Sequence, residues 1–382
     1  MHIAFVTFTG LRSEGSWPAT AASMAKGLEA YGHRVTRIQP EPISNQGYWR
    51  VRKAINMVLG KQFQTERQES VVQELCESVS AQLKGLDPDL VLASSSLPVP
   101  YLRTNAPIAF WTDATFAGMI GFYPEFSRLA RETIRNGMEL EAKALRKADL
   151  AFYSSEWAAR SAIERHGADP AKTHVVPFGP NLDQIPEHGD VMRAITERRR
   201  DRCRLLYIGY DWERKQGDLV VRIHRELRKR GVPSQLVIIG TEPKLTGDLD
   251  GIKVEGLLNK DDPAHLATIL EALHGSHFLV VPSKAECYGM VYAEAATYGL
   301  PSVALNVGGV PTVVRSGVNG QMFEIGSTAG AMAAWIGDTW SDADQYVALA
   351  RSTRTDYERR LAWSVVIAQL TGIVETRRSR VA

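Results

Sequence analysis

Two carboxylates frame a short turn between an apolar run and a helical pattern. Glu286 opens the turn 286–289, and Glu294 lies inside the helix predicted over Met290 to Gly299. The preceding run, Phe278 to Pro282, is typical of a buried parallel strand. A helix amino terminus offers unpaired backbone N–H groups and the positive end of the helix dipole, which suits a diphosphate. At ~1.5 Å per helical residue the carboxylates stand on the order of 10 Å apart, far enough to hold opposite ends of one nucleotide sugar.

A second turn carries positive charge. Lys215 and Arg214 stand in the stretch Gly209 to Gly217, after the apolar run Leu205 to Ile208 and before a helix expected to begin near Asp218. A cation held in a cleft stabilises the negative charge that builds on a departing phosphate. Lys215 is the first choice for this role and Arg214 the second. Taken alone, a lysine in a polar turn is more often solvated surface.

These segments share a resemblance to one family of enzymes. SKAECYGMVYAE resembles the Glu-x7-Glu signature of retaining glycosyltransferases of the GT-B fold, in particular family 4, the glycosyl transferases group 1. YGLPSVALNVGGVPTVVRSGVNGQMFE resembles the continuation of that signature. LLYIGYDWERKQGDLVV resembles the first strand and phosphate-binding turn of the donor domain, and VVPFGPNLD resembles the interdomain segment. The resemblance covers most of the chain from about Ala151 onward. One departure is Tyr210, where family members usually have Arg.

The resemblance implies a role for each matched residue. Glu286 would contact donor sugar hydroxyls, and Glu294 would accept hydrogen bonds from both ribose hydroxyls, for which a carboxylate has two acceptor oxygens. The alternatives are a carboxylate that only complements a helix dipole and an exposed charge on a helix face. The other expected donor-binding residues are Gly209, Arg214, Leu258 and the backbone groups of Cys287, Tyr288, Gly289 and Met290.

The implied reaction moves a sugar from a nucleoside diphosphate to an acceptor hydroxyl with retention of anomeric configuration. The leaving diphosphate would assist deprotonation of the acceptor. We expect no metal and no other cofactor, because Lys215 and the helix amino terminus can neutralise the phosphates. In the family, backbone groups near Gly256 to Asn259 contact the base, so uridine is favoured only as the commoner choice over guanosine or adenosine. The acceptor is left open as a glycan, a lipid-linked molecule or a small molecule.

Two other functions fit the same architecture. A nucleotide-sugar epimerase also cleaves the glycosidic bond between two such domains, but it needs acid and base groups acting on sugar carbons. A catalytically silent nucleotide-sugar binder needs only the binding residues. Turnover with and without an acceptor distinguishes the three.

Alternation of short apolar runs with longer amphipathic ones predicts two successive doubly wound, Rossmann-like α/β units. At 382 residues the chain is long enough for two cores. We expect an acceptor domain over 1–180, a donor domain over 181–358, and a helix over 359–382 that, by resemblance, crosses back to the first domain. In the GT-B fold the two domains face a central cleft. The strand candidates are 2–8, 34–38, 90–93, 108–111, 150–153 and 173–176, then 205–208, 235–239, 252–254, 278–281 and 302–305.

The first domain offers fainter signals. Gly15 and Ser16 stand in a turn before the helix predicted over Ala19 to Tyr31. This layout could bring both residues near a phosphate of the donor or near the acceptor. Asp113 follows the strand ending at Trp111, roughly where many relatives carry a His near the reacting sugar. It either bonds the sugar or orients the acceptor, or it caps a helix.

Composition bounds the partners and the compartment. The formal net charge of +2 does not indicate nucleic-acid binding, and Cys76, Cys203 and Cys287 lack metal-like spacing. A cytoplasmic protein without a signal peptide is expected, and peripheral association with the inner face of the membrane is left open. The basic stretch Tyr48 to Phe63 could lie on a membrane surface or line a groove for a lipid-linked acceptor. The plainer alternative is a surface helix with one buried face.

Overall fold

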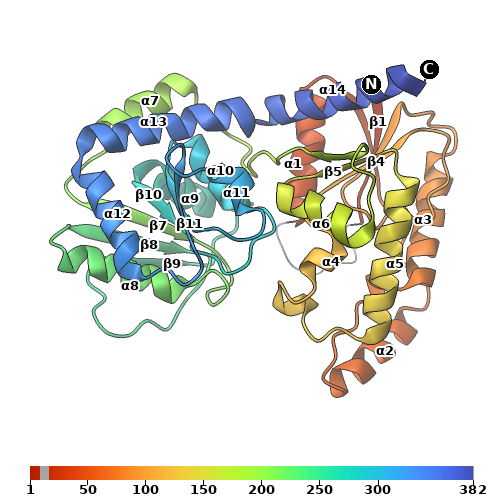
Figure 1. Cartoon of the computed structure of the whole chain (residues 1–382), viewed down its shortest axis with the longest axis horizontal. Coiled ribbons are helices and arrows are strands. Elements are labelled where there is room, and N and C mark those ends of the chain that lie inside the picture. The colour runs from red at the N-terminus through yellow and green to blue at the C-terminus, as the bar shows by residue number, and fades with distance from the viewer. Residues whose placement is uncertain (9–16, 382) are drawn as a thin grey trace. The chain divides into compact units, whose positions relative to one another are not determined.

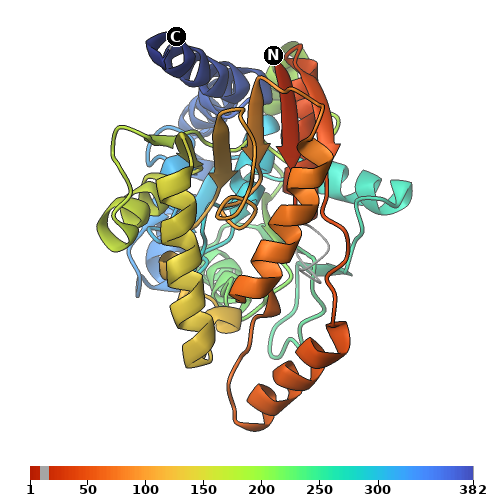
Figure 2. The same cartoon turned by 90° about the vertical axis from the view of Figure 1, so that its right-hand side faces the viewer.

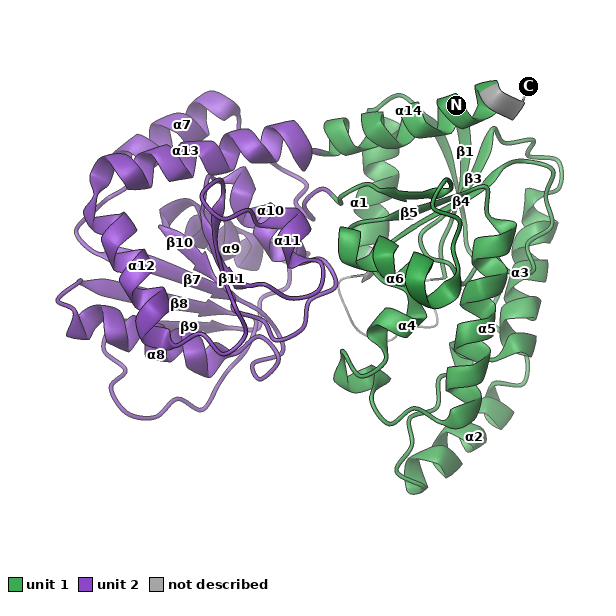
Figure 3. Ribbon diagram, in the orientation of Figure 1, with its two compact units in different colours: residues 1–178, 363–382 green, residues 179–362 purple. Residues whose placement is uncertain are grey.

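The computed structural model describes residues 1–8 and 17–381. It contains two compact units: unit 1 comprises residues 1–178 and 363–382, and unit 2 comprises residues 179–362 (Figure 3). The sequence placed the boundaries at residues 180 and 358. The expected turn residues Gly15 and Ser16 lie outside the described residues.

Unit 1 is built on a parallel six-stranded sheet with the order β2-β1-β3-β4-β5-β6. The strands are β1 (His2–Val6), β2 (Arg34–Ile38), β3 (Leu90–Ala93), β4 (Ile108–Thr112), β5 (Leu150–Tyr153) and β6 (Thr173–Val175). Four of them, β1 and β3 to β5, are apolar almost throughout, as expected when helices cover both faces of a parallel sheet. All six coincide with predicted strands to within two residues.

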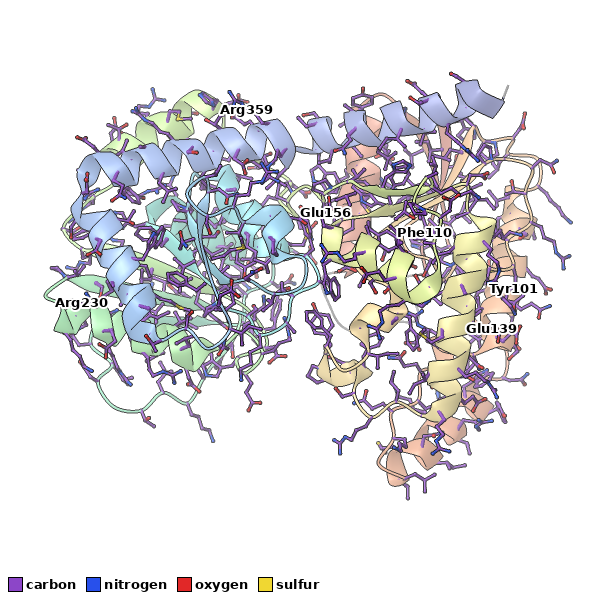
Figure 4. All side chains as sticks on the ribbon, viewed as in Figure 1. Tyr101, Phe110, Glu139, Glu156, Arg230 and Arg359 are labelled. Atoms are coloured by element: carbon purple, nitrogen blue, oxygen red, sulfur yellow. The ribbon has the colours of Figure 1, made fainter. Side chains whose placement is uncertain are left out.

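Helices join these strands and cover the sheet (Figure 1). They are α1 (Trp17–Ala30), α2 (Gln46–Val58), α3 (Glu69–Leu83), α4 (Phe116–Met119), α5 (Arg131–Lys147) and α6 (Glu156–His166), with short 3-10 turns at Thr65–Arg67 and Pro124–Phe126. Figure 4 shows Phe110 inside the unit, where its side chain belongs to the hydrophobic core. Tyr101 and Glu139 lie at the outer edge beside α5, and both contact Lys143.

The C-terminal helix belongs to unit 1, as the resemblance implied. In α14 (Trp363–Val381) the side chains of Val366, Ile367 and Leu370 are fully buried. Gly27 of α1 permits a close approach, because a Cβ there would lie 3.1 Å from the Trp363 ring. The sequence predicted this helix over 359–382. In the structure, α13 (Ala343–Arg360) ends in unit 2 and α14 begins after a two-residue break.

Unit 2 repeats the architecture with a parallel sheet of order β12-β11-β10-β7-β8-β9. The strands are β7 (Cys203–Ile208), β8 (Ser234–Ile239), β9 (Ile252–Gly256), β10 (Phe278–Val280), β11 (Ser302–Leu305) and β12 (Gly320–Phe323). The sequence predicted the first five. It missed β12, which begins at Gly320, because only a turn was expected there.

The helices of unit 2 are α7 (His188–Glu197), α8 (Gly217–Lys229), α9 (Pro263–Gly275), α10 (Met290–Thr297), α11 (Val310–Val313), α12 (Ala329–Ser341) and α13. The polar stretch 183–202, in which the sequence predicted no helix or strand, contains α7. Only Val191 and Ile195 of α7 are buried, and its other residues are mostly exposed. The sequence therefore contained too few apolar positions to predict this helix.

The strand order of unit 2 brings two distant loops together. The chain runs outward from β7 through β8 to β9, then returns to β10 on the other side of β7. In open α/β sheets, ligands bind at this reversal point, outside the carboxyl ends of the strands. The loops after β7 and β10 carry Lys215 and Glu286.

Candidate functional site

The carboxylate of Glu286 is the centre of a buried charge cluster in unit 2. Lys215 Nζ donates a hydrogen bond to Glu286 Oε2 at 3.1 Å, and Arg214 Nη1 donates to the same oxygen at 3.3 Å. A third donor, the Ser283 hydroxyl, lies 3.1 Å away. The side chains of Glu286 and Lys215 are only 12% and 11% exposed, so their charges are little screened by water.

The cations determine the ionisation of this carboxyl. Desolvation by itself would raise the pKa of Glu286, but the charges of Lys215 and Arg214 outweigh it and hold the pKa below its ordinary value. Glu286 is therefore a carboxylate at neutral pH, and it offers acceptor oxygens to a hydroxyl-bearing ligand.

The Lys215 side chain passes so close to position 209 that only glycine fits there. A Cβ on Gly209 would lie 2.2 Å from Lys215 Cδ, so the aliphatic part of Lys215 passes directly over this residue. The adjacent Tyr210, at the position where the family usually has Arg, is 70% exposed. Arg214 is held in turn by Asp211, whose carboxylate accepts from its backbone N–H and its Nε.

Backbone contacts join the loops after β7 and β10. Arg214 Nη1 donates to the Ala285 carbonyl at 2.7 Å, and Gln216 Nε2 donates to the Pro282 carbonyl at 2.6 Å. The Lys284 N–H donates to the Arg214 carbonyl at 2.8 Å. These bonds keep Lys215 and Glu286 together although 71 positions separate them.

The turn before α10 has the backbone conformation that the motif suggested. Gly289 has φ 96°, and a Cβ there would lie 2.5 Å from the ring of Tyr292. Both the backbone conformation and the neighbouring ring therefore exclude a side chain at this position. Cys287 and Tyr288 are each 2% exposed, which leaves their backbone groups rather than their side chains for a ligand. No described side chain caps the first turn of α10.

Glu294 lies in the same helix but has its own cation. Its side chain is 7% exposed, and its Oε1 accepts a hydrogen bond from Lys260 Nζ at 2.6 Å. Lys260 also donates to the Asn181 carbonyl at 3.2 Å. The alternative of an exposed charge on a helix face is therefore wrong. Lys260 stands two residues after Leu258, which is half-buried in the loop that follows β9.

Sequence reasoning missed Ser283, Lys260 and Gln216. Ser283 opens the quoted motif and carried a weak signal, because a hydroxyl so close to Glu286 can reach its carboxylate. Lys260 and Gln216 contact groups of segments that are distant in the sequence, which only the fold identifies.

Asp113 belongs to unit 1 and stands directly after β4. The helix-cap alternative for Asp113 is wrong, because Thr115 is the residue that caps α4, accepting from the Gly118 N–H at 3.0 Å. The same part of unit 1 has an open hollow of about 290 Å³ between the α4 region and α6. Its lining includes Phe122, Trp157 and Arg160, and the two aromatic ring centroids lie 4.9 Å apart.

Neither thiol chemistry nor a protein metal centre is indicated by the described residues. All three cysteines are buried and unpaired in disulfides, and burial raises the pKa of the Cys76 thiol to about 12. Within residues 1–8 and 17–381, no three His, Cys, Asp or Glu side chains gather to hold a metal ion.

Fold and site together define the class. Two parallel six-stranded α/β units are characteristic of the GT-B fold, and one of them carries a buried charge cluster where its strand order reverses. Solved structures agree over the whole chain. Sucrose-phosphate synthase from Thermosynechococcus elongatus matches with a TM-score of 0.70 and 17% identity, covering 100% of both chains. HepE from Anabaena, in complex with UDP-glucose, matches with a TM-score of 0.61 and 17% identity, covering 99% of this chain and 100% of that one.

Sequence comparison identifies the family. Residues 202–342 match the family described as Glycosyl transferases group 1. D-inositol 3-phosphate glycosyltransferase from Geodermatophilus obscurus is 32% identical over 254 residues, 61% of this chain and 52% of that protein. The match over residues 202–342, within unit 2, confirms the resemblance to this family, and the solved structures confirm the predicted fold. The chain spans about half the length of the curated relatives it matches.

Proposed function

We propose that this protein is a glycosyltransferase that moves a sugar from a nucleoside diphosphate donor to an acceptor hydroxyl with retention of anomeric configuration. One observation carries the proposal: Lys215, Arg214 and Glu286 meet in unit 2 where the strand order reverses. We infer that the two cations, with the amino termini of α8 and α10, serve the diphosphate and that the carboxylate serves the sugar. UDP is favoured because HepE, a structural neighbour, holds UDP-glucose.

The ammonium group of Lys215 has three N–H donors. One serves Glu286, and the others can bind an oxygen of the leaving phosphate as its charge develops. The guanidinium of Arg214 supplies a second charge next to it. Glu286, kept ionised by both, accepts hydrogen bonds from sugar hydroxyls, and the leaving phosphate removes the acceptor proton. This assignment gives Glu286 no role as a covalent nucleophile.

Glu294 is proposed to bind the ribose. Its carboxylate has lone pairs for more partners than Lys260 alone, so it can accept from ribose hydroxyls while the ion pair stays intact. Lys260 supplies the counter-charge for this buried carboxylate through the ion pair at 2.6 Å.

The acceptor is proposed to bind unit 1. The hollow lined by Phe122 and Trp157 offers aromatic faces, and Arg160 and Glu164 offer polar groups at its rim. Such a combination of apolar surface and few polar groups is typical of small-molecule sites. Asp113 is proposed to orient the acceptor from the neighbouring loop.

The direct test begins with a thermal-shift panel of UDP-, GDP- and ADP-sugars, since a ligand at 100 times its Kd stabilises a protein by about 2.7 kcal/mol. With the donor identified, Lys215→Met should lower kcat about 10² to 10³-fold, as removal of a developing-anion partner does. Lys229→Met, at the exposed end of α8, is the matched control and should leave kcat unchanged.

Three results would contradict the proposal. Equal turnover by the Lys215→Met and parent enzymes would remove Lys215 from the reaction. Conversion of the donor to an isomeric nucleotide sugar without any acceptor would indicate the epimerase instead. Binding of a donor with no turnover against a broad set of acceptor hydroxyls would indicate the silent binder.

A further inference from the structure

Helix α2 is attached to unit 1 by one narrow face. Its half-buried residues are Trp49, Arg52 and Asn56, and none of its residues is buried. Trp49 stacks on Phe63 with ring centroids 6.3 Å apart, and Arg52 forms an ion pair with Glu132. Figures 1 and 2 both show α2 projecting at one end of the unit, away from the sheet. The alternative of a surface helix with one buried face therefore holds only in part, because the side of α2 that packs on unit 1 is half-buried.

A stripe of large apolar side chains on α2 is exposed. We call Tyr48, Val51, Ile55, Val58 and Leu59 the α2 stripe. Spacings of three, four, three and one residues place them on one side of a helix. Their exposed fractions run from 52% to 83%. With Met57 they make up six of the twelve large apolar side chains exposed among the described residues, so the stripe is a concentration and not a scatter.

The charge of this segment has one sign. Residues 46–61 contain Arg50, Arg52, Lys53 and Lys61 and no Asp or Glu. At about 100° per residue, Arg50 and Lys53 fall on the side of the helix away from the α2 stripe. An apolar side and a basic polar side are the features of helices that lie in the interface of a membrane.

We propose that the α2 stripe docks on the surface of an anionic lipid bilayer, with α2 lying in the plane of the interface. The apolar side chains would enter the boundary between headgroups and acyl chains, and the basic residues would contact lipid phosphates. A second copy of the chain is a poorer occupant, because residues 46–61 contain no Asp or Glu that could pair with the basic side chains of a partner α2 in a symmetric contact. Docking of this kind needs no membrane-spanning helix, and within the described residues every helix is too short or too polar to be one.

Vesicle flotation with the full chain tests the proposal. The protein should float with vesicles made of equal parts phosphatidylglycerol and phosphatidylcholine, and bind pure phosphatidylcholine vesicles much more weakly. Ile55→Ser/Val58→Ser should reduce binding to the anionic vesicles tenfold or more, since each side chain loses the stabilisation of apolar burial. Arg50→Glu should reduce it at least about fivefold, and more so at low salt.

Matched controls separate these effects from loss of folding. Ile325→Ser changes an equally exposed apolar residue of unit 2, and Arg222→Glu reverses an exposed charge on α8. Both should bind vesicles as the parent does. All variants should keep the parent circular dichroism and melting temperature, because the changed side chains are exposed.

Three outcomes would overturn the proposal. The first is a parent protein that stays unbound in both vesicle preparations at low salt. The second is binding by the α2 variants equal to that of the Ile325→Ser control. The third is a dimer in sedimentation velocity that Ile55→Ser/Val58→Ser abolishes, which would assign the α2 stripe to a second copy of the chain.

Discussion

Lys215 and Glu286 neutralise each other before any ligand arrives. Because both are nearly buried, removing either one would leave a charge without its partner in a poorly solvated place, which typically costs about 3–5 kcal/mol. Arg214 and Ser283 also stabilise the carboxylate, because both donate hydrogen bonds to the same oxygen of Glu286. The cluster is therefore preorganised, and a diphosphate can take up N–H donors of the cations without rebuilding the loops.

Gly209 sets the position of Lys215, which gives a prediction at the scale of one residue. In Gly209→Ala the new Cβ would stand 2.2 Å from Lys215 Cδ, so the lysine side chain has to move. We expect kcat to fall at least about tenfold while the fold is retained, since a misplaced cation stabilises the leaving phosphate poorly. Steady-state kinetics with the identified donor measures this.

Gly275→Ala serves as its control. Gly275 ends α9, and a Cβ there would meet no described atom within 4 Å. Its kinetics should match the parent. If Gly209→Ala and Gly275→Ala enzymes were equally active, the position of Lys215 over Gly209 would not matter for the reaction.

The site illustrates what a sequence can tell about single residues. Glu286, Lys215 and Arg214 were predictable because each stands in a turn at the end of an apolar strand, where parallel sheets gather ligand-binding groups. Lys260 was not, because nothing in its local sequence indicates that Glu294 of another element lies 2.6 Å away. Pairing between distant elements follows from strand order, which local patterns do not determine.

At the scale of elements, the strands were predictable where they are apolar throughout, as in β1, β3 and β5. The strand β12 was not predictable. Its first residue is Gly320, with φ 153°, where a Cβ would meet the Ser302 backbone, and its other three residues are only half-buried. The break between α13 and α14 also lacks a signal, since residues 358–364 contain neither Gly nor Pro.

Helix α14 is expected to stabilise unit 1 and not unit 2. Leu370 is fully buried, so Leu370→Ala should lower the free energy of unfolding by about 2–5 kcal/mol through lost burial and the cavity left behind. Hydrogen exchange resolved by peptide should show faster exchange in β1 and β2 and unchanged exchange in β7 and β8. Ile373→Ala, on the same helix but half-buried, should have a smaller effect.

A different pattern would refute this assignment of the helix. Faster exchange in β7 and β8 after Leu370→Ala would mean that α14 supports unit 2, contrary to the division of the chain at residue 362.

At the scale of the whole molecule, each unit contains a histidine that is kept neutral, half-buried His166 in unit 1 and fully buried His277 in unit 2. In unit 1, burial and then the charge of Arg165 lower the pKa of His166 to about 4, and its Nε2 accepts from the Ala117 N–H. In unit 2, burial and then the charge of Arg198 lower the pKa of His277 to about 3. Both rings therefore resist protonation in the folded protein, although both take up a proton near pH 6.5 once unfolded.

Acid should therefore destabilise the fold well above the pH at which carboxylates are protonated. A lowered folded-state pKa means stability that is fully present above pH 6.5 and lost as the pH falls, because only the unfolded state binds the proton. For His277 alone the loss between pH 8 and pH 5 is about 2 kcal/mol, taking an unfolded pKa of about 6.5 and no protonation of the folded ring. The ring is fully buried, so solvent screening does not reduce this figure.

His277→Asn isolates that contribution. The His277 Nδ1 accepts from the Arg204 N–H at 2.9 Å, and an asparagine side-chain oxygen can accept the same hydrogen bond without titrating in this range. Calorimetric unfolding at pH 8 and pH 5 should show a smaller loss of stability for this variant than for the parent. His274→Asn, at an exposed site on α9, should lose as much as the parent. An equal loss in all three proteins would mean that the acid sensitivity of unit 2 arises from groups other than His277.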